Sequence, residues 1–201
     1  ASSPNDMYFV GSSGGIVHYD GSVFRRMESG HDVRFTDAEG TLEGEYVFIV
    51  GYTYVLPVKT QAVMIHDGRL ETLYYSDDID ASPDNGYGAV SSVSVYQDTA
   101  YFVTDAGFWK YNYITGKSTI IPELGHYGYH DLKVQGLNDI FTLGGGFNYV
   151  HYNGVSWKYN RYLLDNYDMS ANSARLKGDK LVMVGFERNL IRGIIIKGTR
   201  F

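Results

Sequence analysis

Short apolar runs recur along this chain and are separated by turn residues. Five of them are rich in β-branched and aromatic residues: Met7–Gly11, Tyr46–Gly51, Ala100–Thr104, Ile140–Gly144 and Leu181–Gly185. Nearly continuous apolar character over so short a run is typical of a strand that is buried on both faces. No stretch shows helical periodicity over a useful length. The pattern therefore predicts an all-β protein.

Further strand-like segments flank these runs in a constant order. Turn residues precede each run: Asn5-Asp6, Glu43-Gly44, Gln97-Asp98, Asn138-Asp139 and Gly178-Asp179. Before four of these turns the sequence predicts another strand, at residues 32–35, 90–96, 131–134 and 174–177. After each of the first four runs an alternating segment, at 23–27, 69–75, 117–121 and 155–162, indicates a half-exposed outer strand.

A tetrapeptide lies between the apolar run and the outer strand. It reads His18-Tyr19-Asp20-Gly21 in its first copy, with close copies at Ile65-His66-Asp67-Gly68 and His151-Tyr152-Asn153-Gly154. Asp or Asn followed by Gly is the chemistry of a tight hairpin turn. Because the histidines recur in different repeats, we expect them to pack or cap on the flank of each sheet rather than to bind a metal.

These observations predict four antiparallel strands per repeat, at a spacing of about 40 to 50 residues that is typical of propeller blades. The repeat units are 1–29, 30–76, 77–122, 123–165 and 166–201, in a single domain spanning 1–201. The first unit lacks its inner strand and the last its outer strand. We predict a β-propeller with five blades, or part of a larger six- to eight-bladed propeller. In a β-sandwich, the competing all-β fold, the strands would not recur with the same turn chemistry.

The sequence also resembles a known repeat. Asn-Asp, an apolar strand, Gly and then Gly-Ile-Val-His-Tyr-Asp-Gly is similar to the pattern of bacterial secreted β-propellers, ND-strand-G-x-G-x-hydrophobic-HYDG-x-W, at residues 5–27 and 138–157. Trp157 stands where that pattern has its Trp, and Phe24 replaces it in the first unit. The resemblance implies the fold and a secreted, periplasmic or cell-surface location. It does not imply a function, because propellers serve as enzymes, lectins and scaffolds alike.

Composition narrows the partners. The 201 residues carry a net charge of −6, which argues against nucleic acid and against an anionic membrane surface. The absence of cysteine excludes disulfides and thiolate chemistry. No apolar run is long enough to span a bilayer, so we expect no membrane insertion. We expect a monomer that binds a glycan or a protein.

Candidate ligand-binding residues lie on the long connections, which in propellers gather at the end opposite the tight turns. His31-Asp32 and His130-Asp131 both lead into a predicted inner strand, and a His beside a carboxylate can act as a base, ligand or anchor. Alternatively, these pairs cap the strand starts and satisfy backbone groups between blades. Tyrosines suit sugar rings or protein partners. The candidates are His31, Asp32, Tyr54, Tyr87, His126, Tyr127, Tyr129, His130, Asp131, Phe147 and Tyr167.

An acidic loop is the only candidate for a cofactor. Asp77, Asp78, Asp80 and Asp84 lie close together in the sequence, and carboxylates at this density could hold calcium. The spacing is not that of an EF-hand, and a solvated acidic loop is the favoured interpretation. We otherwise expect no cofactor.

No nucleophile-elbow, zinc-protease or phosphate-loop motif occurs in the sequence. We therefore predict a non-catalytic binding module that presents a Tyr-rich loop face to a glycan or protein. One alternative is a carbohydrate-active hydrolase or lyase, with His130 and carboxylates at the channel mouth. Another is a scaffold segment of a larger protein.

Overall fold

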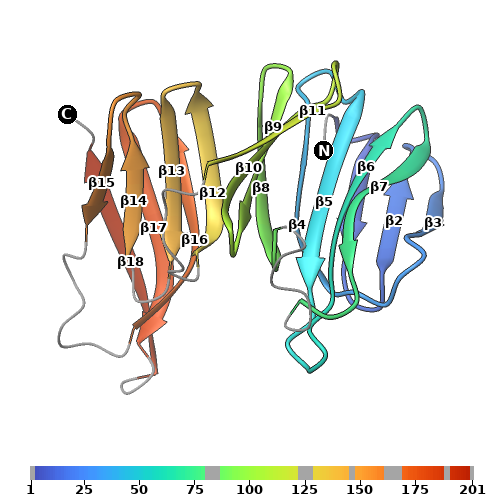
Figure 1. The fold of residues 1–201 in the computed structure, drawn as a ribbon, viewed down its shortest axis with the longest axis horizontal. Coiled ribbons are helices and arrows are strands. Elements are labelled where there is room, and N and C mark those ends of the chain that lie inside the picture. The colour runs from blue at the N-terminus through green and yellow to red at the C-terminus, as the bar shows by residue number, and fades with distance from the viewer. Residues whose placement is uncertain are drawn as a thin grey trace. The chain divides into compact units, whose positions relative to one another are not determined.

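The structure is a computed structural model that describes residues 3–79, 87–121, 129–144, 148–160, 169–187 and 191–199. Over these residues the chain forms 18 strands in five antiparallel sheets and no helix (Figure 1). The described residues therefore contain no helix long and apolar enough to cross a membrane. The all-β prediction is confirmed.

The chain divides into two compact units, Ala1–Glu123 and Leu124–Phe201. The first unit contains three sheets. Sheet 1 comprises β1 (Met7–Val10), β2 (Gly15–Tyr19) and β3 (Phe24–Glu28). Sheet 2 comprises β4 (Phe35–Gly40), β5 (Tyr46–Tyr52), β6 (Thr60–His66) and β7 (Arg69–Ser76). Sheet 3 comprises β8 (Val90–Tyr96), β9 (Thr99–Thr104), β10 (Gly107–Asn112) and β11 (Lys117–Ile121).

The second unit contains two sheets. Sheet 4 comprises β12 (Tyr129–Gly136), β13 (Asp139–Gly144), β14 (Tyr149–Tyr152) and β15 (Trp157–Asn160). Sheet 5 comprises β16 (Met169–Lys177), β17 (Lys180–Glu187) and β18 (Arg192–Thr199). The strands of each sheet are adjacent in the order of the chain, so every sheet is a meander. Sheets 1 and 5 have three strands each, as the sequence predicts.

The predicted position of one inner strand, residues 32–35, is wrong. β4 begins at Phe35 rather than at residue 32. The preceding residues bond to sheet 1 instead of to β5: the Gly14 amide donates to the Val33 carbonyl at 2.7 Å, and the Phe35 amide donates to the Gly11 carbonyl at 3.0 Å. This long-range pairing, which the local sequence does not reveal, keeps residues 31–34 in the connection.

Every inner strand contains a bulge at the same place. Its pairing with the next strand slips by one residue between Phe35 and Asp37, Val90 and Ser92, Tyr129 and Asp131, and Ala171 and Ser173. The residue opposite the start of the bulge is a glycine in sheets 2, 4 and 5: Gly51, Gly144 and Gly185. A β-carbon on Gly51 would lie 2.1 Å from the Arg34 carbonyl oxygen, so the bulge requires glycine there.

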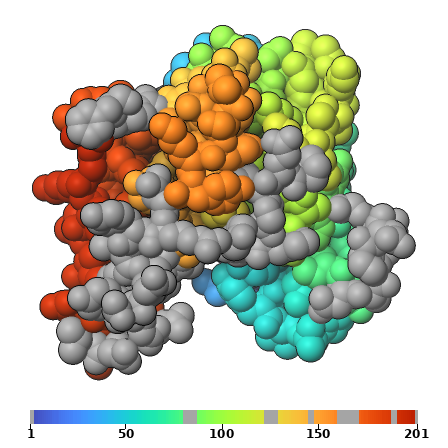
Figure 2. Space-filling view, turned by 60° about the vertical axis from the view of Figure 1, so that its left-hand side comes forward, coloured from blue at the N-terminus to red at the C-terminus, as the bar shows by residue number. Residues whose placement is uncertain are grey.

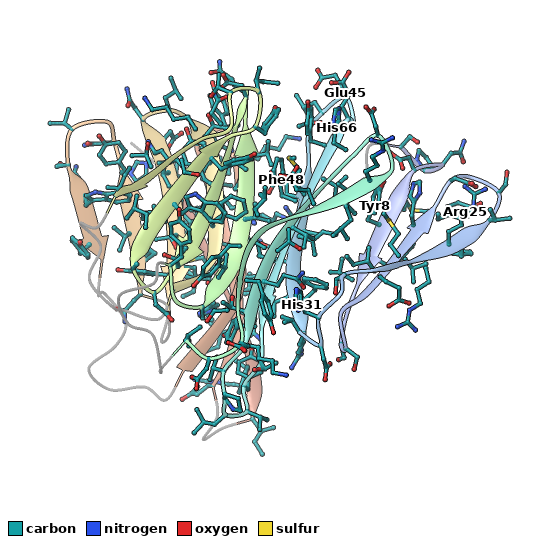
Figure 3. All side chains as sticks on the ribbon, turned by 45° about the vertical axis from the view of Figure 1, so that its right-hand side comes forward. Tyr8, Arg25, His31, Glu45, Phe48 and His66 are labelled. Atoms are coloured by element: carbon teal, nitrogen blue, oxygen red, sulfur yellow. The ribbon has the colours of Figure 1, made fainter. Side chains whose placement is uncertain are left out.

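The core lies between neighbouring sheets rather than within any one of them. One side of β5 places Val47 and Ile49 in a cluster with Ile16 of sheet 1. Its other side places Phe48 and Val50 in a cluster that reaches β9 and β10 of sheet 3 and is crowded with aromatic rings (Figure 3). In the second unit, Phe141 and Leu143 pack in the same way against β16 and β17. Sheet 2 is therefore apolar on both faces, as its continuous apolar run predicts.

We expect Gly51→Ala to lower the free energy of unfolding by about 1–3 kcal/mol, because the new methyl group would overlap backbone that cannot move without breaking the bulge. Gly11, which closes the apolar run of β1, provides the control. Sheet 1 has no inner strand, and a β-carbon on Gly11 would meet no atom within 4 Å. Gly11→Ala should leave the stability unchanged or slightly higher. Equal destabilisation of both variants in urea titrations would contradict this account.

Candidate binding site

The repeated histidines stabilise the tight-turn end of the sheets. His18 Nε2 lies 2.7 Å from Asp6 Oδ1, and its ring stacks on Tyr8 with centroids 4.4 Å apart. His151 Nε2 lies 2.9 Å from Asp139 Oδ1. His66 stacks on Tyr46 at 4.0 Å. Each histidine thus packs against the strand that precedes its own, and the predicted structural role is confirmed.

The acidic or amide residue of the same turns closes the hairpin. Asp20 Oδ1 accepts hydrogen bonds from the amides of Ser22 and Val23, both at 3.0 Å, and Asn153 Oδ1 accepts two in the same way. The backbone amides of Val23 and Ser22 hold the pKa of Asp20 below its ordinary value, since they stabilise the charged form. Gly21 follows with φ of +90°, which favours glycine. These turns therefore have a structural role and are not candidates for the binding site.

Carboxylates on the inner strands bridge neighbouring sheets. Asp37 Oδ2 on β4 accepts hydrogen bonds from Ser92 Oγ at 2.6 Å and from the Val93 amide at 3.1 Å, both on β8. In the second unit, Asp131 on β12 accepts hydrogen bonds from Ser173 Oγ and the Ala174 amide on β16. Both carboxylates follow a bulge on an inner strand. They are the same structural feature, used twice.

The predicted equivalence of the two His-Asp pairs is therefore wrong. The structural counterpart of Asp131 is Asp37, because both lie just after the bulge, opposite Leu143 and Val50. Asp32 lies in the connection before β4 and is exposed. The alternative interpretation, that an aspartate satisfies backbone groups between blades, holds for Asp131.

The remaining candidates of the second unit do not form an open site among the described residues. His130 Nε2 lies 2.7 Å from the Ala171 carbonyl oxygen, so this ring nitrogen is used between sheets 4 and 5. Asp131 is 6 % exposed and also pairs with Lys133 Nζ at 2.8 Å. Tyr129 is half-buried at the start of β12. His126, Tyr127, Phe147 and Tyr167 lie outside the described residues.

In the first unit, candidate residues gather at the loop end of sheet 2. The pairing of Phe35 with Gly51 and of Thr60 with both Tyr52 and Ser76 brings all four strand ends together there. His31 lies at this end, whereas His66 and Glu45 lie at the opposite end (Figure 3). The long connections and the tight turns are thus at opposite ends of the sheet, as predicted.

His31 is held in place by Tyr75. The two rings stack with centroids 3.6 Å apart and an interplanar angle of 14°. The His31 carbonyl accepts hydrogen bonds from Ser29 Oγ and the Val33 amide, each at 3.1 Å. Burial raises the pKa of Tyr75 above its ordinary value, and the charge of Asp77 adds to this effect. A neutral tyrosine therefore supports the imidazole and leaves it half-exposed.

A hollow of about 370 Å³ adjoins His31. It is lined by Ser13, Glu28, Ser29, Gly30, His31 and Asp32. Behind Ser29, Gln61 is fully buried; its Nε2 donates to the Ser29 carbonyl at 3.0 Å and to Thr72 Oγ1 at 3.3 Å. Gln61 Oε1 has no hydrogen-bond partner among the described residues. The hollow is polar and carries two carboxylates, so it suits a donor group of a ligand.

Aromatic and cationic side chains also lie at the loop end of sheet 2. Tyr54 packs edge-on against Tyr52 with centroids 4.8 Å apart, and the Arg34 guanidinium lies 5.4 Å from the centre of the Tyr54 ring. Burial, followed by the hydrogen bond with Tyr54, raises the pKa of Tyr52 well above its ordinary value. Tyr52 therefore acts as a neutral support on which Tyr54 stands outward.

The connection between β5 and β6 contains three consecutive exposed apolar side chains. Tyr54, Val55 and Leu56 are 64 %, 76 % and 75 % exposed, and we call these three residues the β5–β6 tip. The tip projects past the end of β5 (Figure 1) and forms part of the uncovered cyan surface low in the space-filling view (Figure 2). Thr53 closes its base, where the Thr53 amide donates to the Lys59 carbonyl at 2.8 Å.

Tyr87 lies just before β8 and packs into the core rather than onto an open surface. Its ring stacks on Trp109 with centroids 4.5 Å apart and meets Tyr74 edge-on at 5.0 Å. Its backbone carbonyl accepts the Ala106 amide at 3.2 Å. Tyr87 therefore packs against Trp109 and Tyr74 and does not present its ring to a ligand.

The acidic loop shows no metal centre where it is described. No group of acidic and histidine side chains suited to a metal occurs among the described residues, which include Asp77 and Asp78. Asp80 and Asp84 lie outside them. The calcium hypothesis therefore gains no support from Asp77 and Asp78.

No protein family matches this sequence, and no curated protein does either. Solved structures match it in fold. YCF48 bound to D1 peptide aligns with 92 % of this chain at a TM-score of 0.62 and 13 % identity, and a structural-genomics protein from Bacteroides thetaiotaomicron VPI-5482 aligns with 92 % at 0.61 and 11 %. A luciferin-regenerating enzyme aligns with 100 % of the chain at 0.68 and 12 %.

These structures define the class of fold. Their likeness shows that the five antiparallel sheets are those of a β-propeller protein. The chain spans 58 % and 51 % of the lengths of the first two proteins and 77 % of the third. At these identities the likeness extends to the fold alone.

Sequence reasoning missed four residues of this surface: Arg34, Val55, Leu56 and Tyr75. A usable signal for the tip was present, because Tyr-Val-Leu-Pro in a connection between two buried strands is an apolar run without a strand to join. No local signal marks Arg34 or Tyr75, whose roles depend on contacts with Tyr54 and His31.

The carboxylate between sheets 2 and 3 gives a stability prediction. Asp37→Ala should lower the free energy of unfolding by about 1–3 kcal/mol, because it leaves the Val93 amide without an acceptor. In a double-mutant cycle with Ser92→Ala, the two changes should be non-additive. The exposed Asp32→Ala is the control and should change the stability by less than about 0.5 kcal/mol. A cycle in which the effects simply add would show that the carboxylate does not act through Ser92.

Proposed function

We propose that this chain is a non-catalytic binding module, a propeller of five blades with one blade per sheet, that binds a protein or peptide at the loop end of sheet 2. The observation that carries the proposal is the β5–β6 tip, where three consecutive apolar side chains are mostly exposed. A contiguous apolar surface of this kind is unfavourable in water and is typical of an interaction site.

The chemistry around the tip suits a polypeptide partner. Tyr and Arg are enriched at the centres of protein interfaces, and Tyr54 lies beside Arg34 here. The hollow next to His31 offers carboxylates to a partner's amide or cationic groups. One protein of the same fold, YCF48, has been solved with a bound peptide, which supports this class of partner.

The site is also held in shape before a ligand arrives. The Ile79 amide donates to the Val58 carbonyl at 3.0 Å, and Lys59 and Thr53 close the base of the tip. Because these hydrogen bonds restrict the backbone at the base of the tip, binding costs less backbone conformational entropy. The resemblance to secreted propeller repeats adds that the module acts outside the cytoplasm.

The structure bears differently on two alternative functions, glycan binding and hydrolysis. A glycan could stack on the exposed Tyr54 ring, so a sugar ligand is a second candidate at the same surface. The hydrolase alternative relied on His130 and neighbouring carboxylates at an open site. His130 and Asp131 instead form hydrogen bonds between sheets 4 and 5, so these two residues give the hydrolase no support.

The proposal can be tested by panning a displayed library of random peptides against the folded chain. Peptides that bind should lose about 30-fold or more in affinity for Leu56→Asp and for Tyr54→Ala, as expected for residues at the centre of an interface. Leu42→Asp is the matched control: Leu42 is 95 % exposed in the turn at the other end of the same sheet. Its affinity for the peptides should equal that of the unaltered chain.

Peptides whose affinity is unchanged by Leu56→Asp and Tyr54→Ala would contradict the proposed site. A glycan array run on the same variants distinguishes the partner class. Binding of a sugar that depends on Tyr54, with no peptide recovered, would replace the polypeptide with a glycan as the ligand.

A further inference from the structure

One buried side chain of sheet 2 is polar in a row that is otherwise apolar. Gln61, Val63 and Ile65 alternate along β6, and the last two pack in the cluster shared with sheet 1. Residues two apart in a strand lie on the same face, so the fully buried Gln61 also faces sheet 1. It pairs with Gly51, opposite the bulge, and the residues at this place in sheets 3, 4 and 5 are Gly107, Asn148 and Ile194. The fold therefore does not require a glutamine here.

The Gln61 amide uses its donors but not its acceptor. Nε2 donates to the Ser29 carbonyl at 3.0 Å and to Thr72 Oγ1 at 3.3 Å, whereas Oε1 is buried without a partner among the described residues. A buried acceptor without a donor lowers stability, and its partial negative charge favours a cation nearby because the surroundings screen it little. Ser29, to which this amide is bound, lines the hollow beside His31.

Close packing holds the wall of this hollow in shape. A β-carbon on Gly14 would lie 2.2 Å from the His31 carbonyl oxygen and 2.4 Å from Ser29 Oγ, so the approach of these segments requires glycine. Tyr75, which pairs with Gln61 across β6 and β7, stacks on the His31 ring from the other strand. The hollow is therefore preformed, at the end of the sheet where Figure 3 places His31.

The charge around the hollow is negative. Glu28 and Asp32 both line it, and both are exposed. Glu28 shares its charge with Arg26 at 2.8 Å, in a pair that is open to solvent, while Asp32 forms no ion pair among the described residues. Burial raises the pKa of Tyr75 and the charge of Asp77 adds to this effect, so a third carboxylate acts on the same region. A positively charged group is favoured here.

The cation that fits is organic rather than a metal ion. No group of acidic and histidine side chains suited to a metal occurs in the part of the chain that the structure describes. The Arg34 guanidinium lies over the Tyr54 ring at 5.4 Å, so this nearby cation is used by the β5–β6 tip and not by Asp32. A hollow of about 370 Å³ has room for a side chain of several carbons that ends in a charged group.

We propose that the hollow beside His31 binds a basic side chain, lysine or arginine, of the polypeptide partner. This inference rests on the proposed function and adds the composition of the recognised segment: an apolar residue for the β5–β6 tip and a basic residue for the hollow. The ammonium or guanidinium group meets Asp32 and Glu28, and the unpaired acceptor of Gln61 behind Ser29 favours its charge. The net charge of −6 attracts a basic segment as it approaches.

Two displayed peptide libraries test the inference, one that contains Lys and Arg and one built without them. The first should yield peptides that bind about 10-fold more tightly than any from the second, as expected for a charge-assisted contact. Peptides without Lys or Arg that bind the tip equally tightly would overturn the inference and leave the proposed function intact. If neither library yields a peptide whose binding depends on the tip, the proposed function fails, and this inference fails with it.

A double-mutant cycle then locates the basic residue. Asp32→Asn, which keeps the shape of the side chain, should weaken a recovered basic peptide about 10-fold, and so should replacement of the peptide's Lys or Arg by Gln. The two changes together should cost little more than either alone, because they remove the same contact. Glu45→Gln is the matched control at the opposite end of the sheet (Figure 3), and its effect should stay below about 2-fold because salt screens distant charges. Additive effects of Asp32→Asn and the peptide change would overturn the inference.

Discussion

The stacking of sheets on one another is the interaction on which this structure depends, because within each unit the apolar side chains of one sheet are buried against the next. Val47 and Ile49 of β5 point to one neighbour, and Phe48 and Val50 point to the other. At about 25 cal/mol per Å² of apolar surface removed from water, neither face can remain exposed without a large loss of stability. A single sheet of this kind has no core of its own, so its stability comes from its neighbours, as in other repeat architectures.

The inner strands fix how the sheets stack. Each of them is bulged at the same place, and the residue after the bulge is Asp37, Ser92, Asp131 or Ser173. Sheets 2 and 3, and sheets 4 and 5, are joined in the same way. A serine hydroxyl and the backbone amide of the next residue both donate to an aspartate on the preceding sheet. Because a hydrogen bond is directional while apolar packing is not, these aspartates set the register between sheets that the apolar residues merely hold together.

The stabilising contacts and the proposed binding surface lie at opposite ends of the sheets. The tight-turn end is stabilised by local contacts such as His18 with Asp6, while the inner strands stabilise the middle. The loop end is then free to carry side chains that destabilise the folded state slightly, such as the exposed Leu56 of the β5–β6 tip. A rigid scaffold that presents functional residues on its connections is the usual arrangement in proteins.

The local sequence was sufficient wherever a structural feature is itself local. The apolar runs located β1, β5, β9, β13 and β17, and the Asp-Gly and Asn-Gly turns located the hairpins and the structural histidines. It failed where a distant segment decides the outcome. The Gly14 amide takes the Val33 carbonyl and delays β4, which made Asp32 look like the counterpart of Asp131. His31 and Tyr75 are 44 positions apart, and only folding brings their rings together.

The last strand of sheet 5 differs in composition from the outer strands of sheets 1, 2 and 3. β3, β7 and β11 each carry charged residues, for example Arg26, Glu71 and Lys117, and charge on an edge strand discourages pairing with another chain. β18 has no such protection at its centre, where Ile194, Ile195 and Ile196 follow one another. The composition of β18 is that of an interior strand, although the strand lies at the edge of its sheet. Ile194 and Ile196 pack against the apolar cluster of the second unit, while Ile195, on the other side of the strand, is 67 % exposed.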